Sequence, residues 1–305
     1  TLNPGDLTWD VIKSYGTVDY HDRTPVDEMP ERCRHAEVII TNKAIVNAST
    51  IEAARDLKLI LVTATGYNIV DVDAARKHKV VVCNVPDYGT ASVAQHTFAL
   101  ILELANHVGA NSRAVSSGEW TNSPDFAFSK ASITELQGKV IGIVGLGRIG
   151  AQVARLADAF DMKVLYNSRQ PKNSRFGTYA SLEELLAESD IVSLHCPLTR
   201  ENTKFMNSGQ LRRMKKNAWL INTSRGGLIE ESDLAEALRN GVIAAAALDV
   251  LSVEPPPSGN PLLSAPNCMI TPHNAWLSLE ARTRILKVTE SNLAAFLKQQ
   301  PVNVV

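Results

Sequence analysis

The chain has 305 residues, of which 45% are hydrophobic and 21% charged, an ordinary composition for a globular protein. Its formal net charge of −1 provides no long-range attraction to nucleic acid or to an anionic membrane. No apolar run approaches the ~20 residues that span a bilayer, and the first residues lack the basic start and apolar core of a secretory signal. We therefore expect a cytoplasmic protein of two domains, with neither nucleic acid nor a membrane as partner.

The cysteines give a second indication of the compartment. The four of them are scattered along the chain without a C-x-x-C pair: Cys33, Cys83, Cys196 and Cys268. This spacing favours reduced thiols over a disulfide framework or a zinc site, and no bound metal is expected.

Short β-branched runs alternate with helical stretches in the first third of the chain. Apolar runs separated by helices are typical of a parallel sheet. Because the first such run begins only at Val38, we also expect a short strand to precede residue 1. The predicted elements are strands at 38–41, 59–62 and 80–83, with helices at 49–55, capped by Ser49 or Thr50, and at 72–77.

A long helix is predicted over residues 92–115, ending at Ser117-Gly118 before a polar loop at 121–132. Residues 97–104 are apolar on nearly every face, so this helix must be buried on several sides. An ordinary core helix and a contact between two copies explain that pattern equally well. The second explanation predicts a homodimer built on this helix.

A second strand–helix series begins at Lys139 and runs to a closing amphipathic helix at 279–298. The chain is therefore predicted to form two α/β units. The predicted strands of the second series are 140–144, 163–166, 191–194, 218–221, 244–248 and 268–270, with helices at 181–187 and 231–239 among them.

A glycine-rich turn joins the first strand of this series to a helix. The strand leads into Gly145-Leu146-Gly147-Arg148-Ile149-Gly150. In this setting Gly145 permits a tight turn, Gly147 lets the backbone approach a pyrophosphate, and Gly150 lets the helix pack on the strand. The start of the helix adds free N–H groups for the phosphates. The turn therefore predicts a dinucleotide site, with a ligand-free glycine turn as the alternative.

The end of the next strand bears on the choice of coenzyme. NAD sites usually carry Asp or Glu about 20 residues after the glycines, where the carboxylate holds the ribose 2′-hydroxyl. This chain has Asn167-Ser168-Arg169 there, with Lys172 close behind. No carboxylate repels a 2′-phosphate, and Ser168 and Arg169 could bind one, so NADP is slightly favoured. NAD remains open, with Arg169 as a solvated residue over the adenine.

Three polar segments follow later strands, at the sheet edge where open α/β folds bind ligands. Arginine can grip a carboxylate and polarise a keto oxygen. Histidine can donate the proton that accompanies a hydride, and a carboxylate beside it orients the ring and favours its protonated form. Each residue alone could equally be a surface or loop residue. The segments are Asn222-Thr223-Ser224-Arg225-Gly226-Gly227, Glu254-Pro255-Pro256 and Thr271-Pro272-His273-Asn274-Ala275-Trp276.

Together and in this order, residues 145–150, 223–227, 254–256 and 272–273 resemble the signature blocks of the D-isomer-specific 2-hydroxyacid dehydrogenase family, and the resemblance covers essentially the whole chain. It implies two doubly wound parallel-sheet domains, one Rossmann-like and one flavodoxin-like. The dinucleotide-binding domain (95–276) would be inserted in the substrate domain (1–94 and 277–305), with the active site in the cleft. The resemblance also implies that Arg225, Glu254 and His273 are the catalytic residues.

The resemblance implies ligand contacts as well. Thr65, Gly66 and Tyr67 would hold the substrate carboxylate through their backbone N–H groups, and Trp276 would shape the substrate pocket. Asp249 would bond the carboxamide of the coenzyme. The complete set predicted to bind the coenzyme is Thr97, Gly145, Gly147, Arg148, Ile149, Gly150, Asn167, Ser168, Arg169, Cys196, Pro197, Thr223, Ser224, Asp249 and Asn274.

Within the family, residues 1–9 are similar to the glycerate dehydrogenases, also called hydroxypyruvate reductases. This similarity implies hydride transfer between NAD(P)H and a small 2-keto or 2-hydroxy acid, with hydroxypyruvate and D-glycerate as the pair. The alternatives are glyoxylate reductase or another D-2-hydroxyacid dehydrogenase. A more remote one is a nucleotide-sensing protein like the C-terminal-binding-protein corepressors. Asn68, where the family often has Asp, leaves the substrate open.

Overall fold

The computed structural model of the protein describes residue 2 and residues 5–305. Thr1, Asn3 and Pro4 lie outside the described residues, and with them part of the segment 1–9 that resembles glycerate dehydrogenases. The chain divides into a terminal unit, Thr1–Gly89 with Leu277–Val305, and a central unit, Thr90–Trp276. Both units are α/β structures with parallel sheets, which confirms the predicted fold class. Over the described part of the chain, no helix is both long and apolar enough to cross a membrane.

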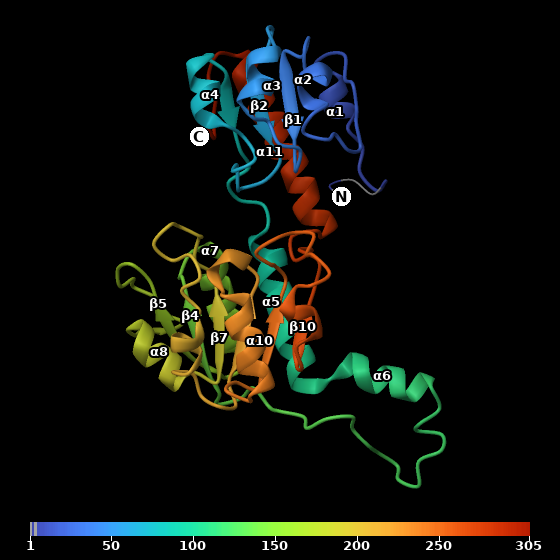
Figure 1. The fold of residues 1–305 in the computed structure, drawn as a ribbon, viewed down its shortest axis with the longest axis vertical. Coiled ribbons are helices and arrows are strands. Elements are labelled where there is room, and N and C mark those ends of the chain that lie inside the picture. Colours follow the sequence, from blue (N-terminus) through green and yellow to red (C-terminus); the bar gives the residue numbers. More distant parts are fainter. Residues whose placement is uncertain (1, 3–4) are drawn as a thin grey trace. The chain divides into compact units, whose positions relative to one another are not determined.

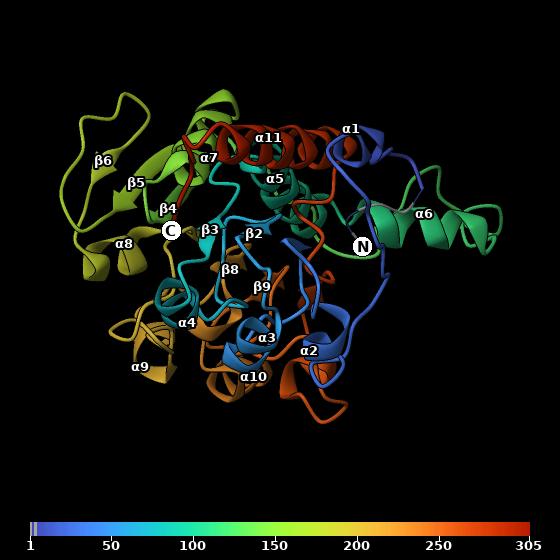
Figure 2. The ribbon, with the colours of Figure 1, turned by 90° about the horizontal axis from the view of Figure 1, so that it is seen from above.

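The terminal unit is built on a three-stranded parallel sheet in the order β1-β2-β3. Side chains of β2 alternate between its two faces: Leu59 and Leu61 pack in one cluster with Leu293, and Ile60 and Val62 pack in another. Figure 2 shows α11 on one side of this sheet and α3 and α4 on the other. The elements are β1 (Val38–Thr41), β2 (Leu59–Val62), β3 (Val81–Cys83), α1 (Asp10–Lys13), α2 (Met29–Arg32), α3 (Ala48–Ala53), α4 (Val72–Lys77) and α11 (Leu279–Leu297).

The start of α3 differs from the prediction. Asn47, rather than Ser49 or Thr50, is the N-cap, and its side-chain oxygen accepts a hydrogen bond from the backbone N–H of Thr50 at 3.1 Å. Asparagine is among the best N-cap residues, because its oxygen satisfies an N–H group that the helix leaves unpaired.

The central unit is built on a seven-stranded parallel sheet in the order β10-β9-β8-β7-β4-β5-β6. From β4 the chain first adds strands on one side and then returns to add β7 on the other, so the winding direction reverses between β4 and β7. Every predicted strand is present within one residue at each end, and β6 was not predicted. The strands are β4 (Val140–Val144), β5 (Lys163–Asn167), β6 (Thr178–Tyr179), β7 (Ile191–Leu194), β8 (Trp219–Asn222), β9 (Ala245–Leu248) and β10 (Cys268–Ile270).

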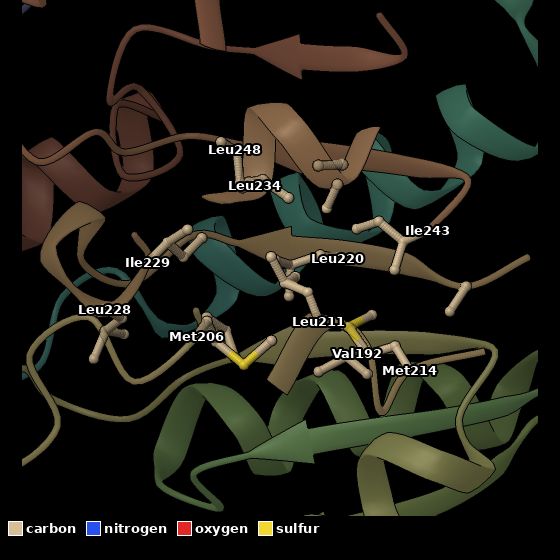
Figure 3. Packing of buried hydrophobic residues seen from close by; sticks show 14 of the residues in the cluster. Val192, Met206, Leu211, Met214, Leu220, Leu228, Ile229, Leu234, Ile243 and Leu248 are labelled. Atoms are coloured by element: carbon tan, nitrogen blue, oxygen red, sulfur yellow. The ribbon is translucent and has the colours of Figure 1, made fainter. Parts of the chain in front are cut away.

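Helices cover both faces of this sheet. On one face Phe98 and Ile101 of α5 pack against Ile141, Ile143 and Val153. Figure 3 shows the other face, where Leu220 and Leu248 lie among leucines and methionines from the surrounding helices and loops. Each such side chain contributes about 1.5–3 kcal/mol through burial. The helices are α5 (Thr90–Asn106), α7 (Arg148–Ala159), α8 (Leu182–Glu188), α9 (Ser208–Leu211) and α10 (Glu231–Arg239), with short 3₁₀ turns at Gly226–Leu228 and Pro261–Ser264.

The prediction of one continuous helix over residues 92–115 is wrong. Helix α5 ends at Asn106, and a separate helix, α6 (Val108–Ser116), follows His107, whose φ of 52° is left-handed. The carboxylate of Glu103 accepts hydrogen bonds from the N–H of Gly109 at 3.1 Å, which fixes the break. Figure 1 shows α6 and the segment after it leaving the body of the central unit.

The glycine turn between β4 and α7 needs two of its glycines for the fold. Gly145 has a φ of +102°, and a Cβ there would lie 2.6 Å from the backbone nitrogen of Cys196. A Cβ on Gly150 would lie 2.2 Å from the carbonyl oxygen of Gly145. In contrast, a Cβ on Gly147 would meet nothing within 4 Å. The fold therefore does not account for Gly147.

We predict that Gly150→Ala lowers the apparent midpoint of thermal unfolding. The added methyl must push α7 away from β4, and overpacking of this kind costs about 1–3 kcal/mol, or about 2–12 °C for a domain of this size. Differential scanning calorimetry would measure the shift, with Gly147→Ala as the matched control that leaves the midpoint unchanged. Equal midpoints for the two variants would contradict the assigned role of Gly150.

Candidate active site

The side chains of His273 and Glu254 are in hydrogen-bond contact in the central unit. The Nδ1 atom of His273 lies 2.5 Å from the Oε2 atom of Glu254, and the two side chains are 28% and 33% exposed. The other carboxylate oxygen of Glu254 accepts a hydrogen bond from the N–H of Leu251 at 3.0 Å. With Nδ1 turned to Glu254, Nε2 is the ring nitrogen left to exchange a proton with a ligand.

The backbone of His273 is strained. Its φ is +49°, in the left-handed region that side chains with a Cβ rarely adopt. Such a conformation costs about 1–3 kcal/mol and persists only where the surroundings impose it. Here the N–H of His273 donates to the carbonyl oxygens of Asp249 at 2.8 Å and of Thr271 at 3.0 Å. Strain held in this way is common at functional sites.

The loop that carries Arg225 follows β8 and is organised by a buried asparagine. The side chain of Asn222 accepts from the N–H of Ser224 at 3.0 Å and donates to the carbonyl oxygen of Arg225 at 2.9 Å. Gly226 allows the loop to pass Leu251, because a Cβ there would lie 1.9 Å from that residue's carbonyl carbon. The Arg225 side chain is exposed, and its guanidinium donates to the carbonyl oxygen of Ser224 at 2.7 Å.

Several residues predicted to bind the coenzyme contact each other. The hydroxyl oxygens of Thr97 and Thr223 are 2.9 Å apart, and both residues are buried. The hydroxyl of Ser224 donates to the carbonyl oxygen of Cys196 at 2.6 Å. Thus the loops after β7 and β8 are joined directly, and α5 is fixed to the second of them.

The predicted adenosine side lies at the end of β5, next to the glycine turn. The carbonyl oxygen of Asn167 accepts from the N–H of Gly145 at 2.8 Å, and its side-chain amide donates to Ala180 at 3.0 Å. The ammonium of Lys172 donates to the carbonyl oxygen of Leu146 at 2.7 Å, which places a positive charge against the turn. Arg169 is exposed, Ser168 is partly buried, and the hydroxyl of Ser168 donates to the carbonyl oxygen of Gln170 at 2.6 Å.

Two ionisable residues follow β7 at the same edge. Burial lowers the pKa of His195 to about 4, so its ring is neutral at pH 7 and pairs with the hydroxyl of Ser193 at 2.8 Å. Burial raises the pKa of the Cys196 thiol, so it is protonated at neutral pH and is no nucleophile. Pro197, next in the chain, is exposed, and its carbonyl oxygen accepts from the Asn202 amide at 2.8 Å.

The predicted substrate loop lies in the terminal unit, after β2. The hydroxyl of Thr65 donates to the carbonyl oxygen of Val85 at 2.8 Å, and its own carbonyl oxygen accepts from the Asn84 amide at 2.8 Å. Gly66 and Tyr67 follow in an irregular segment, where Tyr67 is exposed. Trp276 is buried and belongs to the central unit.

Two residues of α5 without a predicted role also contact the predicted site. Ser92 of α5 donates its hydroxyl to the carbonyl oxygen of Ala275 at 2.6 Å. The Nε2 atom of His96, one turn further along the helix, lies 3.0 Å from the hydroxyl oxygen of Thr271. The sequence signal that could have indicated them is the i, i+4 spacing of Ser92 and His96 next to an apolar stretch. In the described residues, no group of three or more His, Cys, Asp or Glu side chains could hold a metal.

Comparisons with known proteins identify the family. The model of the D-isomer-specific 2-hydroxyacid dehydrogenase NAD-binding domain matches residues 98–275. A hydroxypyruvate reductase of Blautia hydrogenotrophica is 43% identical over 100% of this chain and 96% of its own length. A glycerate dehydrogenase of Methylorubrum extorquens is 37% identical, with 94% and 91% covered. The crystal structure of a Thermus thermophilus protein matches with a TM-score of 0.89 at 37% identity, covering 97% of this chain and 95% of that one.

The family model matches more than half of the chain, and these relatives align with nearly all of it. The resemblance predicted from the sequence motifs is therefore confirmed. The chain belongs to the D-isomer-specific 2-hydroxyacid dehydrogenase family, and it is an oxidoreductase of that family.

Proposed function

We propose that this protein is a hydroxypyruvate reductase, which in the reverse direction oxidises D-glycerate. The His273–Glu254 pair carries the chemical part of this proposal, because Glu254 orients the ring of His273 as a proton donor. Arg225 lies in another of the loops that follow strands of the central sheet. The substrate part is supported by the likeness to a protein named hydroxypyruvate reductase at 43% identity. The central unit would bind the coenzyme and the terminal unit would contribute to substrate binding.

The proton chemistry follows from the ring geometry. In reduction, His273 gives the proton on Nε2 to the keto oxygen as that oxygen gains negative charge. Glu254, bonded to Nδ1, fixes the tautomer and stabilises the ring while it is positively charged. In oxidation the same nitrogen accepts the hydroxyl proton, so one pair serves both directions.

The substrate would be held by its carboxylate and its keto oxygen. Arg225 is exposed and attached to a loop made rigid by Asn222, so its planar guanidinium can bind a carboxylate through two parallel hydrogen bonds. The backbone N–H groups of Thr65, Gly66 and Tyr67 would add further donors to the carboxylate. Trp276 would limit the size of the group attached to C2.

Three observations support the binding of a nicotinamide dinucleotide to the central unit. Gly147 has open space where any Cβ would point, and α7 begins there with no side-chain cap over its N–H groups. In addition, the side-chain oxygen of Asn274 is buried without a partner in the described chain, as suits a ligand donor. When bound, the coenzyme supplies the hydride. Residues 145–150, with Thr97, Cys196, Pro197, Thr223, Ser224, Asp249 and Asn274, would hold it.

We favour NADP over NAD as the coenzyme. The position that would carry a ribose-binding carboxylate is Asn167, whose amide is bonded to Ala180. Ser168 and Arg169 lie on the same loop, and Lys172 adds a second positive charge beside the glycine turn. A 2′-phosphate would thus meet two cations at the end of β5.

Initial rates with hydroxypyruvate, measured with NADPH and NADH side by side, test the substrate and the coenzyme together. We expect reduction of hydroxypyruvate with the higher kcat/KM for NADPH, and loss of that preference in Arg169→Leu. A preference for NADH would overturn the coenzyme proposal and leave the substrate in place. Reduction of glyoxylate or pyruvate, but not of hydroxypyruvate, would keep the family and overturn the substrate.

The proton donor is tested by His273→Ala. We expect kcat to fall by about 10²–10⁴-fold, the usual contribution of a positioned acid or base, with little change in coenzyme affinity measured by tryptophan fluorescence. His35→Ala is the matched control, because His35 also lies near a carboxylate, Asp56 at 4.0 Å, but on the surface of the terminal unit. Wild-type turnover in His273→Ala would end the assignment.

We further propose a homodimer in which the segment 108–133 contacts the second copy. Most apolar residues of α5, such as Phe98, Leu100 and Ile101, are buried within their own unit. The apolar character of this helix is therefore explained without a second copy of the chain. The segment after it leaves the body of the unit (Figure 1) and exposes Phe126, which is 92% exposed. Val108, Trp120 and Ile133 are also exposed, and a large exposed apolar set of this kind marks an interaction surface.

Sedimentation velocity at micromolar concentration tests the dimer. We expect a dimer for the wild type and a shift towards monomer for Phe126→Asp, because a buried carboxylate at the contact is unfavourable. Tyr20→Asp, which changes an exposed aromatic residue of the terminal unit, should remain dimeric. A monomeric wild type would contradict the proposal. A dimeric Phe126→Asp would show that the contact does not depend on Phe126 and lies elsewhere on the chain.

A further inference from the structure

The carboxylate of Asp249 binds the segment that carries His273. Its Oδ1 atom accepts from the hydroxyl of Thr271 at 2.6 Å and from the N–H of Asn274 at 2.9 Å. Its Oδ2 atom accepts from the N–H of Ala275 at 3.0 Å, and its backbone oxygen accepts from the N–H of His273 at 2.8 Å. The residue is 1% exposed. Asp249 therefore holds the loop after β10, in addition to any contact with the coenzyme.

Thr271 connects this carboxylate to α5. Because the Thr271 hydroxyl donates its hydrogen to Asp249, its oxygen is free to accept from His96, whose Nε2 lies 3.0 Å away. The same Nε2 atom lies 3.5 Å from the Oδ1 atom of Asp249. His96 therefore donates a hydrogen bond to Thr271, and Thr271 donates one to Asp249. Ser92, one turn earlier on α5, holds Ala275 at the far end of the loop.

The loop needs this support because His273 adopts a left-handed backbone conformation. A residue with a Cβ leaves that conformation unless its surroundings prevent it. A change of φ at His273 would swing the imidazole about the backbone and break its contact with Glu254. The hydrogen bonds at Thr271, Asn274 and Ala275 flank His273 on both sides, where they oppose such a change.

We propose that His96 and Thr271 are positioning residues for the proposed reaction, which hold His273 in its working orientation through the carboxylate of Asp249. The inference rests on the proposed function, because it takes His273 as the proton donor. Neither residue touches the reacting atoms. Their effect is therefore on kcat, and the binding of substrate and coenzyme stays as it is.

The decisive variant is Thr271→Val, which keeps the shape of the side chain and removes the hydroxyl. We expect kcat for hydroxypyruvate to fall by about 10–100-fold, since small misplacements of a reacting group have effects of this size. The KM for hydroxypyruvate and the coenzyme Kd should stay within about twofold, because uniform binding is unchanged. Thr271→Ser, which restores the hydroxyl, should return most of kcat.

His96 is tested through its coupling to Thr271. We expect His96→Phe to lower kcat as well, and the double variant with Thr271→Val to be no slower than Thr271→Val alone, because both changes break one chain of hydrogen bonds. Thr283→Val is the control, because it removes an exposed threonine hydroxyl that donates to Leu279 in α11. It should leave kcat and KM at wild-type values.

Three outcomes would overturn the proposal in distinguishable ways. A wild-type kcat in Thr271→Val, with His273→Ala inactive, would leave the proposed function intact and remove the positioning role. Equal loss of coenzyme binding and kcat in Thr271→Val, unrescued by Thr271→Ser, would replace positioning by a general structural role. Full activity in His273→Ala would overturn both the proposed function and the inference that depends on it.

Discussion

The parallel direction of all seven strands in the central sheet is the constraint on which the candidate site depends. Parallel strands end at the same edge, so each loop that follows a strand delivers its residues there. Gly145 after β4, Thr223 after β8, Asp249 after β9 and His273 after β10 are far apart in the sequence and share this edge. The hydrogen bonds between these loops, rather than the strands themselves, then set the positions of individual side chains.

The reversal between β4 and β7 shows how closely backbone segments must approach at this edge. The turn after β4 passes so near the backbone at Cys196 that Gly145 has room for no Cβ. The same turn brings α7 onto β4, where Gly150 is needed for contact with Gly145. Gly147 alone is free of such contacts. The fold therefore requires Gly145 and Gly150, whereas Gly147 is explained by the proposed ligand.

Local patterns in the sequence predicted the strands and the glycine turn well, because burial and turn geometry depend on neighbouring residues. The break at His107 was missed, since no proline interrupts residues 92–115 and the contact of Glu103 with Gly109 has no periodicity. β6 is only two residues long and carries no strand signal of its own. The spacing of Ser92 and His96 marks two polar residues on one helix, but it does not reveal the partner of His96. Thr271 is 175 residues away, and only the folded sheet brings the two together.

The hydrogen bonds that α5 makes to two loops explain why this mostly buried helix contains polar residues. Burying a polar group is unfavourable unless it is hydrogen-bonded, and each of these is bonded: Ser92 to Ala275, His96 to Thr271, and Thr97 to Thr223. Residues 92 and 96 hold the loop of His273, and residue 97 holds the loop of Arg225. Because both loops are attached to one rigid helix, a displacement of α5 would move both of them together. The spacing of three polar side chains on one helix thus relates the proposed proton donor to the proposed carboxylate-binding residue.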